Sequence, residues 1–410
     1  MPAATARRFL AGVGLQSLGR GGQALAAFVT VLVLAAALDA PLLGIYGVYE
    51  TLFALAEVLI DGGSGNAVVR RAGARPAALR PALRQAWRFR LATTLIAAAA
   101  ITAYAGLDSA AGAGHPGLAL ATLALASHLA TTRAAVFQLR LRFGLPAVLR
   151  TLTAVLVLVA VTAVLAAGVR DPLWCLAAAQ GARAAGNLCL GLAAGRLLRE
   201  YPAAGPPEAG FLSECLALGA GGLVREAYGR MDLLLVRALL GTAAAGVYTP
   251  IRKLFHLALQ LPSFIGVVAM PSLAAAADRT ELRARCVTLA RRTAWIGFPA
   301  ALLAVPLAPW FVERFFGPAF TAGVVPLQVL GAAAALVFPG SVLTTGLVAA
   351  GAARETLRLA LVVLVVALAG NLALLPAAGL TGAAVARVLA EAVALVGAAR
   401  LLRGGAPGGV

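Results

Sequence analysis

Long apolar stretches separated by short polar segments dominate this chain. There are twelve such stretches, and the alternating pattern of β-barrel strands is absent. An apolar stretch of roughly 18 residues or more can cross a hydrocarbon core of about 30 Å as a helix. The twelve stretches cover about 12 to 37, 43 to 68, 91 to 107, 117 to 138, 146 to 168, 173 to 195, 212 to 239, 246 to 270, 293 to 313, 323 to 350, 359 to 376 and 380 to 400. The pattern predicts an all-α integral membrane protein with about 12 transmembrane helices.

Composition agrees with a membrane location. The 410 residues are 61% hydrophobic and 12% charged, with a mean hydropathy of +0.91, whereas soluble domains are about 25% charged. The net charge of +18 would suggest nucleic acid in a soluble protein, but here the basic residues cluster between spans, so we expect no nucleic-acid partner. The spacing of Cys175, Cys189, Cys215 and Cys286 fits no metal or redox motif. We interpret them as small core residues and expect no metal, no cofactor and no catalytic residue.

Most of the 34 basic residues lie in alternate inter-span segments. If the N-terminus is inside, the cytoplasmic side receives Arg7 and Arg8, the seven arginines from Arg70 to Arg90 and the later arginine clusters, and the other side receives Arg170, Arg237 and Arg314. Positive charge is retained on the cytoplasmic side. We therefore expect a multi-pass protein of the cell (inner or plasma) membrane with both termini cytoplasmic. The first apolar run has no clear cleavage site, which favours a retained span over a signal peptide.

The segment 70 to 90 also has an amphipathic character. Arg80, Arg84 and Arg88 share one helical face, which suits a helix lying along the anionic inner leaflet. A pure orientation signal is the alternative interpretation.

The chain contains an internal repeat. GIYGVYETLFALA, 44 to 56, matches GVYTPIRKLFHLA, 246 to 258, at an offset of 202 residues, from Gly44 to Gly246. The Pro/Gly-rich stretch 201 to 210 cannot continue a helix and divides the chain nearly in half. Six spans separate the two copies, so both run in the same direction. We expect two six-helix lobes, 1–205 and 206–410, related by a pseudo-two-fold axis along the membrane normal.

Charged residues recur within the expected spans, where a charge costs at least about 2.5 kcal/mol and usually faces a watery or protein-lined interior. One stripe is mainly acidic and contains Tyr46, Glu50, Glu57 and Asp61; the equivalent stripe of the second half is basic and contains Tyr248, Arg252, His256 and Gln260, with Lys253 beside it. The seventh span carries Arg225, Glu226, Arg230 and Asp232. Further candidates are Arg20, His128, Arg133, Arg183, and Arg387 with Glu391.

Structural interpretations stand beside these functional ones. Arg252 lies only about 10 Å from the outer end of its span, from which it could reach the headgroups. Asp61 could simply mark the end of a span. The pairs Glu226–Arg230 and Arg387–Glu391 have the i,i+4 spacing of structural ion pairs. A cavity with arginine, lysine and histidine walls would suit an anionic ligand, and a phosphate above all, because arginine donates two parallel hydrogen bonds to it.

Several motifs resemble one family. The run 225 to 275 resembles the seventh and eighth spans of O-antigen and exopolysaccharide flippases, which belong to the multidrug, oligosaccharidyl-lipid and polysaccharide exporter superfamily. The positions that carry the likeness are Asp232, Gly241, Gly246, Tyr248, Arg252 and Pro271. The stretches 44 to 71, 139 to 150, 315 to 330 and 371 to 393 are similar too, the last with Asn371, Pro376, Gly379, Gly382 and Glu391. Pro250 and the DGGSG turn depart from the pattern.

The resemblance implies a two-lobed transporter, not an enzyme, that flips an undecaprenyl-pyrophosphate-linked oligosaccharide to the outer leaflet by alternating access. On this basis the pyrophosphate candidates are Arg252, Lys253, His256, Arg225 and Arg230; further cavity candidates are Arg20, Arg133, Tyr46 and Tyr248; ion-coupling or gating candidates are Glu50, Glu57, Asp61 and Asp232. Expected partners are the lipid-linked oligosaccharide, membrane lipids, H⁺ or Na⁺, and a polysaccharide polymerase or glycosyltransferases.

Other functions stay open at this point. A multidrug or cation antiporter of the same superfamily would use the carboxylates, and a peptidoglycan-precursor flippase would share the fold but usually has fourteen spans. A membrane glycosyltransferase would need larger outer loops than this chain has. A non-transporting scaffold of the same fold also fits. An ATPase is disfavoured because the chain lacks the G-x-x-x-x-G-K-[ST] motif.

Overall fold

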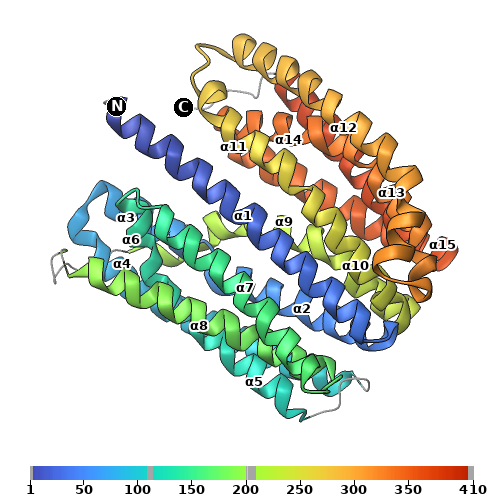
Figure 1. Ribbon diagram of the computed structural model, residues 1–410. Helices are drawn as coiled ribbons and strands as arrows, with labels where there is room; N and C mark the ends of the chain where they lie inside the picture. The colour runs from blue at the N-terminus through green and yellow to red at the C-terminus, as the bar shows by residue number, and fades with distance from the viewer. Residues whose placement is uncertain (1–2, 109–113, 200, 202–208, 405–410) are drawn as a thin grey trace. The chain divides into compact units, whose positions relative to one another are not determined.

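A computed structural model describes residues 3–108, 114–199, 201 and 209–404, with side chains from residue 19 onward apart from 267 and 271. Figure 1 shows the helices that make up this part of the chain. Most of the linker 201 to 210 and the side chains of Arg7, Arg8 and Pro271 lie outside the description. No strand occurs among the described residues, which confirms the all-α prediction.

The helices divide into two compact units. Unit 1 comprises Met1–Leu38 and Ile45–Glu226, and unit 2 comprises Asp39–Gly44 and Ala227–Val410. The division falls inside α9 (Phe211–Leu240) and not at the linker, because the first half of α9 packs on unit 1. There Glu214 contacts Arg70 at 2.8 Å and Arg71 at 2.7 Å. The two lobes 1–205 and 206–410 remain a prediction.

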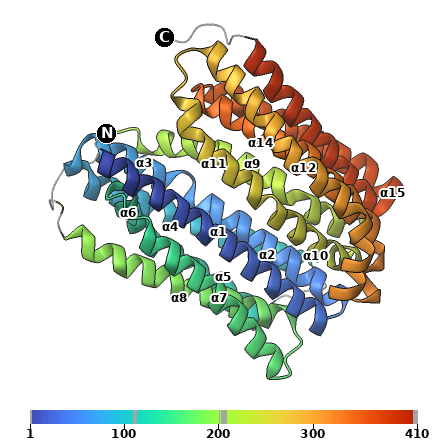
Figure 2. The ribbon, with the colours of Figure 1, turned by 45° about the horizontal axis from the view of Figure 1, so that its top comes forward.

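Besides the first half of α9, the described part of unit 1 contains seven whole α-helices, most of α2 and two 3-10 segments; the start of α2, up to Gly44, belongs to unit 2. They are α1 (Ala3–Ala37), α2 (Ala40–Asp61), α3 (Ser64–Ala74), η1 (Pro76–Ala78), α4 (Leu79–Leu107), α5 (Pro116–Ala124), η2 (Leu125–Ala134), α6 (Ala135–Leu139), α7 (Gly144–Ala166) and α8 (Pro172–Leu198). Helix α8 begins at a proline, and Asp171 caps it by accepting from Leu173 N at 2.8 Å. Figure 2 shows α7 and α8 side by side.

Unit 2 contains the second half of α9 and six more helices with one 3-10 turn. They are α10 (Thr242–Ala258), α11 (Gln260–Ala274), α12 (Arg279–Phe315), η3 (Pro318–Gly323), α13 (Val324–Ala332), α14 (Ala334–Ala349) and α15 (Ala353–Arg403). Helix α15 is two helices joined at Gly379, whose φ of 57° and ψ of −141° are not helical. This break coincides with the predicted turn between spans 359 to 376 and 380 to 400.

The expected spans all fall on helical segments. The number of helices that are apolar enough to span, and the start of the third span, differ from the prediction. Eight helices among the described residues are long and apolar enough to cross a membrane, or nine if the bent pair α13–α14 is one span. Helices α8 and α9 are not among them, and the broken α15 counts once. The third span was predicted to start at 91, but α4 begins at Leu79, so the arginine-rich segment continues directly into the span. Trp87, Arg84 and Arg88 are exposed on it, whereas Arg90 is buried.

Buried small and aliphatic side chains form the cores of both units. In unit 1 Val68 of α3, Leu79 and Ala86 of α4, and Cys215 of α9 pack in one cluster; in unit 2 Cys286 of α12 and Val342 and Leu347 of α14 pack in another. Cys175 is buried too, as predicted, but Cys189 is exposed because it lies on an outward face of α8. None of the four cysteines forms a disulfide.

The repeat has a physical basis at its first glycine. A Cβ on Gly44 would lie 2.1 Å from Thr242 O, and a Cβ on Gly246 would lie 1.7 Å from Ala40 O. These contacts are reciprocal, since Ala40 and Thr242 are also equivalent under the repeat. The starts of α2 and α10 therefore cross with their backbones in contact, as small residues allow in membrane proteins.

We expect Gly246→Ala to destabilise the protein by about 1–3 kcal/mol, because the methyl group cannot fit without moving the start of α2, which belongs to unit 2, away from α10. Gly73→Ala is the matched control, since a Cβ on Gly73 of α3 meets no atom within 4 Å and alanine is the better helix former. Thermal unfolding of the two variants in detergent tests this. Equal melting temperatures would contradict the close approach.

Candidate functional site

The acidic stripe of α2 meets basic side chains from three different helices of unit 1. Glu50 is buried at 5% exposure and lies 3.5 Å from the Arg183 guanidinium of α8. Tyr46, one turn before Glu50, is buried beside it. Because a buried carboxylate without a partner is costly, Arg183 accounts for the tolerance of Glu50 inside the unit.

Glu57 faces His128 of η2, with Oε1 and Nε2 3.9 Å apart. The pair has a looser geometry than Glu50–Arg183, and both side chains are only partly buried. The segment that carries His128 is a 3-10 helix of 10 residues, whereas such helices rarely exceed 3–4 residues and often mark hinges or strain. The fourth expected span is thus α5, η2 and α6 in sequence, and not one regular α-helix.

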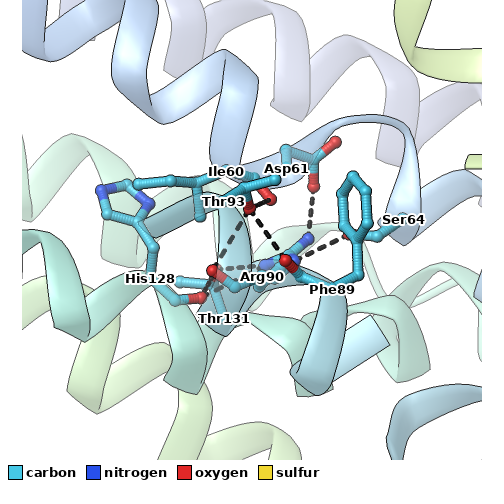
Figure 3. A network of polar contacts seen from close by, with 8 residues as sticks. All are labelled: Ile60, Asp61, Ser64, Phe89, Arg90, Thr93, His128 and Thr131. Atoms are coloured by element: carbon cyan, nitrogen blue, oxygen red, sulfur yellow. Dashed lines mark hydrogen bonds and ion pairs between the residues drawn. The ribbon is translucent and has the colours of Figure 1, made fainter. Parts of the chain in front are cut away.

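Asp61, the last residue of α2, forms an ion pair with Arg90 of α4 (Figure 3). Arg90 also donates to Ser64 Oγ at 2.8 Å, to Thr131 Oγ1 at 2.8 Å and to the His128 carbonyl at 3.3 Å. One guanidinium therefore joins the ends of α2 and α3 to η2. Asp61 both ends its helix and carries a paired charge.

Unit 2 has its own charged layer, in which α9 and α10 meet. Asp232 of α9 is buried at 5% exposure, and Tyr248 of α10 donates to its carboxylate at 3.0 Å. The same carboxylate accepts from Leu233 N at 2.8 Å. Tyr248 therefore fixes the register of α10 against α9.

Arg387 of α15 connects three helices of unit 2. It contacts Glu391 one turn further on at 3.0 Å, and its guanidinium lies 4.2 Å from the Tyr228 ring centroid and 5.6 Å from that of Phe255. Tyr228 in turn donates to Glu391 at 2.6 Å. The Arg387 guanidinium therefore has an ion-pair partner and two aromatic rings around it, which supports the interpretation of Arg387–Glu391 as a structural pair.

Arg252 is the other buried arginine of unit 2. Its exposure is 2%, and it lies on α10 one turn after Tyr248 and one turn before His256. His256 stacks edge-on against Phe255, and its buried Nε2 has no hydrogen-bond partner among the described residues. Lys253 is half-buried on the same helix. Three basic residues thus lie within one and a half turns of α10.

The remaining basic candidates are more exposed than Arg252. Arg230 is half-buried on the unit 2 part of α9, whereas Arg225 is exposed and belongs to unit 1, as does Glu226. Arg20 of α1 and Arg133 of η2 are exposed. The site roles of all these residues stay predictions.

Arg90 is a site residue that the sequence did not reveal. It ends a run of seven arginines and was therefore expected on the cytoplasmic side, but its side chain is 6% exposed and lies inside unit 1. One signal was available. The helical face of Arg90 also contains Ala86, Leu83 and Thr94, all buried, whereas Arg84 and Arg88 lie on the opposite, exposed face.

The chain is similar to known proteins in sequence and in structure. A family model described as polysaccharide biosynthesis protein matches residues 33–325. No curated protein matches at a significant level. Among solved structures, the lipid II flippase MurJ in an inward closed conformation has a TM-score of 0.77 at 10% identity, over 95% of this chain and 87% of that chain.

Two MATE transporters are similar as well. An outward-facing MATE family transporter of the MOP superfamily has a TM-score of 0.67 at 14% identity, over 97% of this chain and 94% of that one. The MATE transporter VcmN of Vibrio cholerae has a TM-score of 0.67 at 13% identity, over 98% and 97%. The structural similarity over nearly the whole chain shows the fold. Together with the family model, this similarity identifies the chain as an integral membrane protein with the multidrug, oligosaccharidyl-lipid and polysaccharide exporter fold that belongs to the polysaccharide biosynthesis protein family.

Proposed function

We propose that this protein flips an oligosaccharide linked to undecaprenyl pyrophosphate from the inner to the outer leaflet of the cell membrane, by alternating access, for cell-surface polysaccharide synthesis. The observation that carries the proposal is the buried Arg252 with its basic neighbours on α10, in a chain of the polysaccharide biosynthesis family. The fold supports it, since one similar structure is a flippase of lipid II.

The two buried arginines of unit 2 have different neighbours. Arg387 contacts Glu391 and the Tyr228 ring. Arg252 is on α10 with the basic residues Lys253 and His256. A pyrophosphate would accept two parallel hydrogen bonds from its guanidinium. Arg230 of α9 belongs to the same unit as Arg252 and completes the proposed set.

The acidic residues of α2 have a different proposed role. Glu50 and Asp61 each pair with an arginine, whose charge does not change in the physiological range. Glu57 lies 3.9 Å from the imidazole of His128 and also interacts electrostatically with Arg183. Because an imidazole can exchange a proton whereas a guanidinium cannot, Glu57 with His128 is the proposed site of a coupling proton in unit 1, with Asp232 as the corresponding candidate in unit 2.

We expect Glu57→Gln to abolish the acceleration of flipping by a proton gradient in proteoliposomes, while slow flipping without a gradient persists. The amide keeps the shape of the side chain but cannot take up the proton. Glu313→Gln, on α12 of unit 2, is the control. An unchanged response to the gradient in Glu57→Gln would remove Glu57 from the coupling mechanism.

Deletion of the gene tests the function against its alternatives. We expect loss of surface polysaccharide and accumulation of the lipid-linked oligosaccharide in the inner leaflet, with unchanged drug susceptibility. A multidrug antiporter predicts the reverse: increased drug susceptibility and normal polysaccharide. A peptidoglycan-precursor flippase predicts lipid II accumulation and lysis. The pairing of all three α2 carboxylates with bases argues against the antiporter, which needs a carboxylate for its cationic substrate.

A further inference from the structure

A small pocket lies in unit 2 where four helix ends meet. The start of α12, the end of α14 and both ends of α15 line it. Its walls include Leu282, Leu347, Leu401 and Leu402, and its charged side chains are Arg279 and Glu355. It is remote in sequence from the charged layer of α9 and α10, and the proposed transport role does not involve it.

The two charged residues of the pocket do not neutralise each other. Neither Arg279 nor Glu355 forms an ion pair or a side-chain hydrogen bond with any residue in the described part of the chain, although both line the same pocket. Arg279 is in the first turn of α12, where the helix dipole disfavours a cation, and the cap of that helix is provided by Asp278. Helix stability therefore does not explain the arginine.

The surroundings of the pocket suit the boundary between headgroups and acyl chains. Exposed arginines occupy the same helix ends, namely Arg283, Arg354, Arg358, Arg400 and Arg403. Exposed apolar side chains begin within two turns of the pocket on α14 and α15, at Val348, Leu361 and Val396. An arginine-rich end followed by exposed apolar surface is the pattern of a membrane protein at the headgroup level.

We propose that this pocket binds one phospholipid whose headgroup carries both a phosphate and a primary ammonium group, as in phosphatidylethanolamine. Arg279 binds the phosphate, Glu355 accepts hydrogen bonds from the ammonium group, and the leucine walls contact the start of the acyl chains. An anionic headgroup without an ammonium group leaves Glu355 opposed to a negative charge. A choline headgroup has no N–H to donate to the carboxylate.

Native mass spectrometry of the purified full-length protein tests this proposal, with an equimolar mixture of phosphatidylethanolamine, phosphatidylglycerol and phosphatidylcholine that have the same acyl chains. We expect retention of one phosphatidylethanolamine about tenfold over phosphatidylcholine, the size of one charge-assisted hydrogen bond. Glu355→Gln should bring the two to parity, and Arg279→Gln should lower retention of all three lipids. Arg283→Gln, one turn along α12 and outside the pocket, should behave as wild type.

The outcomes that overturn the proposal are distinct. A wild-type preference for phosphatidylglycerol would indicate a site for anionic lipid formed by the arginines alone. If Glu355→Gln left the ratio of phosphatidylethanolamine to phosphatidylcholine unchanged, the pocket would not recognise the ammonium group. Equal retention of all three lipids by the wild type would show the same. Melting temperatures in lipid-free detergent should match the wild type for all variants, which separates lost binding from lost folding.

Discussion

Replacing Arg252 by methionine is expected to abolish polysaccharide export at an unchanged protein level. Methionine keeps much of the buried volume but removes the charge and the hydrogen bonds that the proposed pyrophosphate would accept. Two charge-assisted hydrogen bonds contribute roughly 1.5–3 kcal/mol each, so flipping should fall by at least about 100-fold. Complementation of a deletion strain measures the effect, with the amount of protein in the membrane determined in parallel.

Two companion variants separate the explanations for such a loss. Arg252→Lys keeps the charge but not the planar fork, so it should restore part of the activity. Arg358→Met removes an exposed arginine from the start of α15 and should export normally. Full export by Arg252→Met would mean that the residue faces the headgroups or plays only a packing role, and the phosphate assignment would be wrong.

Replacing Arg90 by methionine is expected to lower the free energy of unfolding by about 3 kcal/mol. The variant leaves Asp61 without its ion pair and removes donors from Ser64, Thr131 and the His128 carbonyl. The value lies at the low end for buried pairs because Asp61 is 51% exposed and can recruit water. Chemical denaturation in detergent provides the measurement.

The neighbouring Arg88 offers a matched control for Arg90. It is two residues away on the same helix and exposed, so Arg88→Met should change stability by less than about 0.5 kcal/mol. Asp61→Asn should cost less than Arg90→Met, since the amide keeps one hydrogen bond and the arginine keeps its other acceptors. Similar stabilities for Arg90→Met and Arg88→Met would show that the network in Figure 3 does not hold α2, α3 and η2 together.

The helices were predictable because local sequence encodes them. Apolar runs indicated where the helices lie, and the gap between the last two predicted spans coincides with the break at Gly379 of α15. The repeat matched Gly44 with Gly246, and the structure shows that these positions pack reciprocally. Helix ends were less predictable. The segment before position 91 contains many arginines and no long apolar run, yet Leu79, Ala82, Leu83 and Ala86 bury one face of it against unit 1 and continue α4.

The partners of the charged residues could not be predicted. The spacing of Glu50, Glu57 and Asp61 indicates one helical face, but their partners Arg183, His128 and Arg90 come from three other segments. Only tertiary packing brings these together. By contrast Arg387 and Glu391 are one turn apart, so their pairing follows from the sequence, whereas the contact of both with Tyr228 does not.

The central claim is that the basic face of α10 binds a lipid pyrophosphate. Its most direct test is the affinity of the purified protein, in detergent, for a short-chain polyprenyl pyrophosphate and for the corresponding monophosphate. We predict that the wild type binds the pyrophosphate at least about tenfold more tightly and that Arg252→Met removes this preference. Equal affinity of the wild type for both lipids, or a preference that survives in Arg252→Met, would contradict the claim.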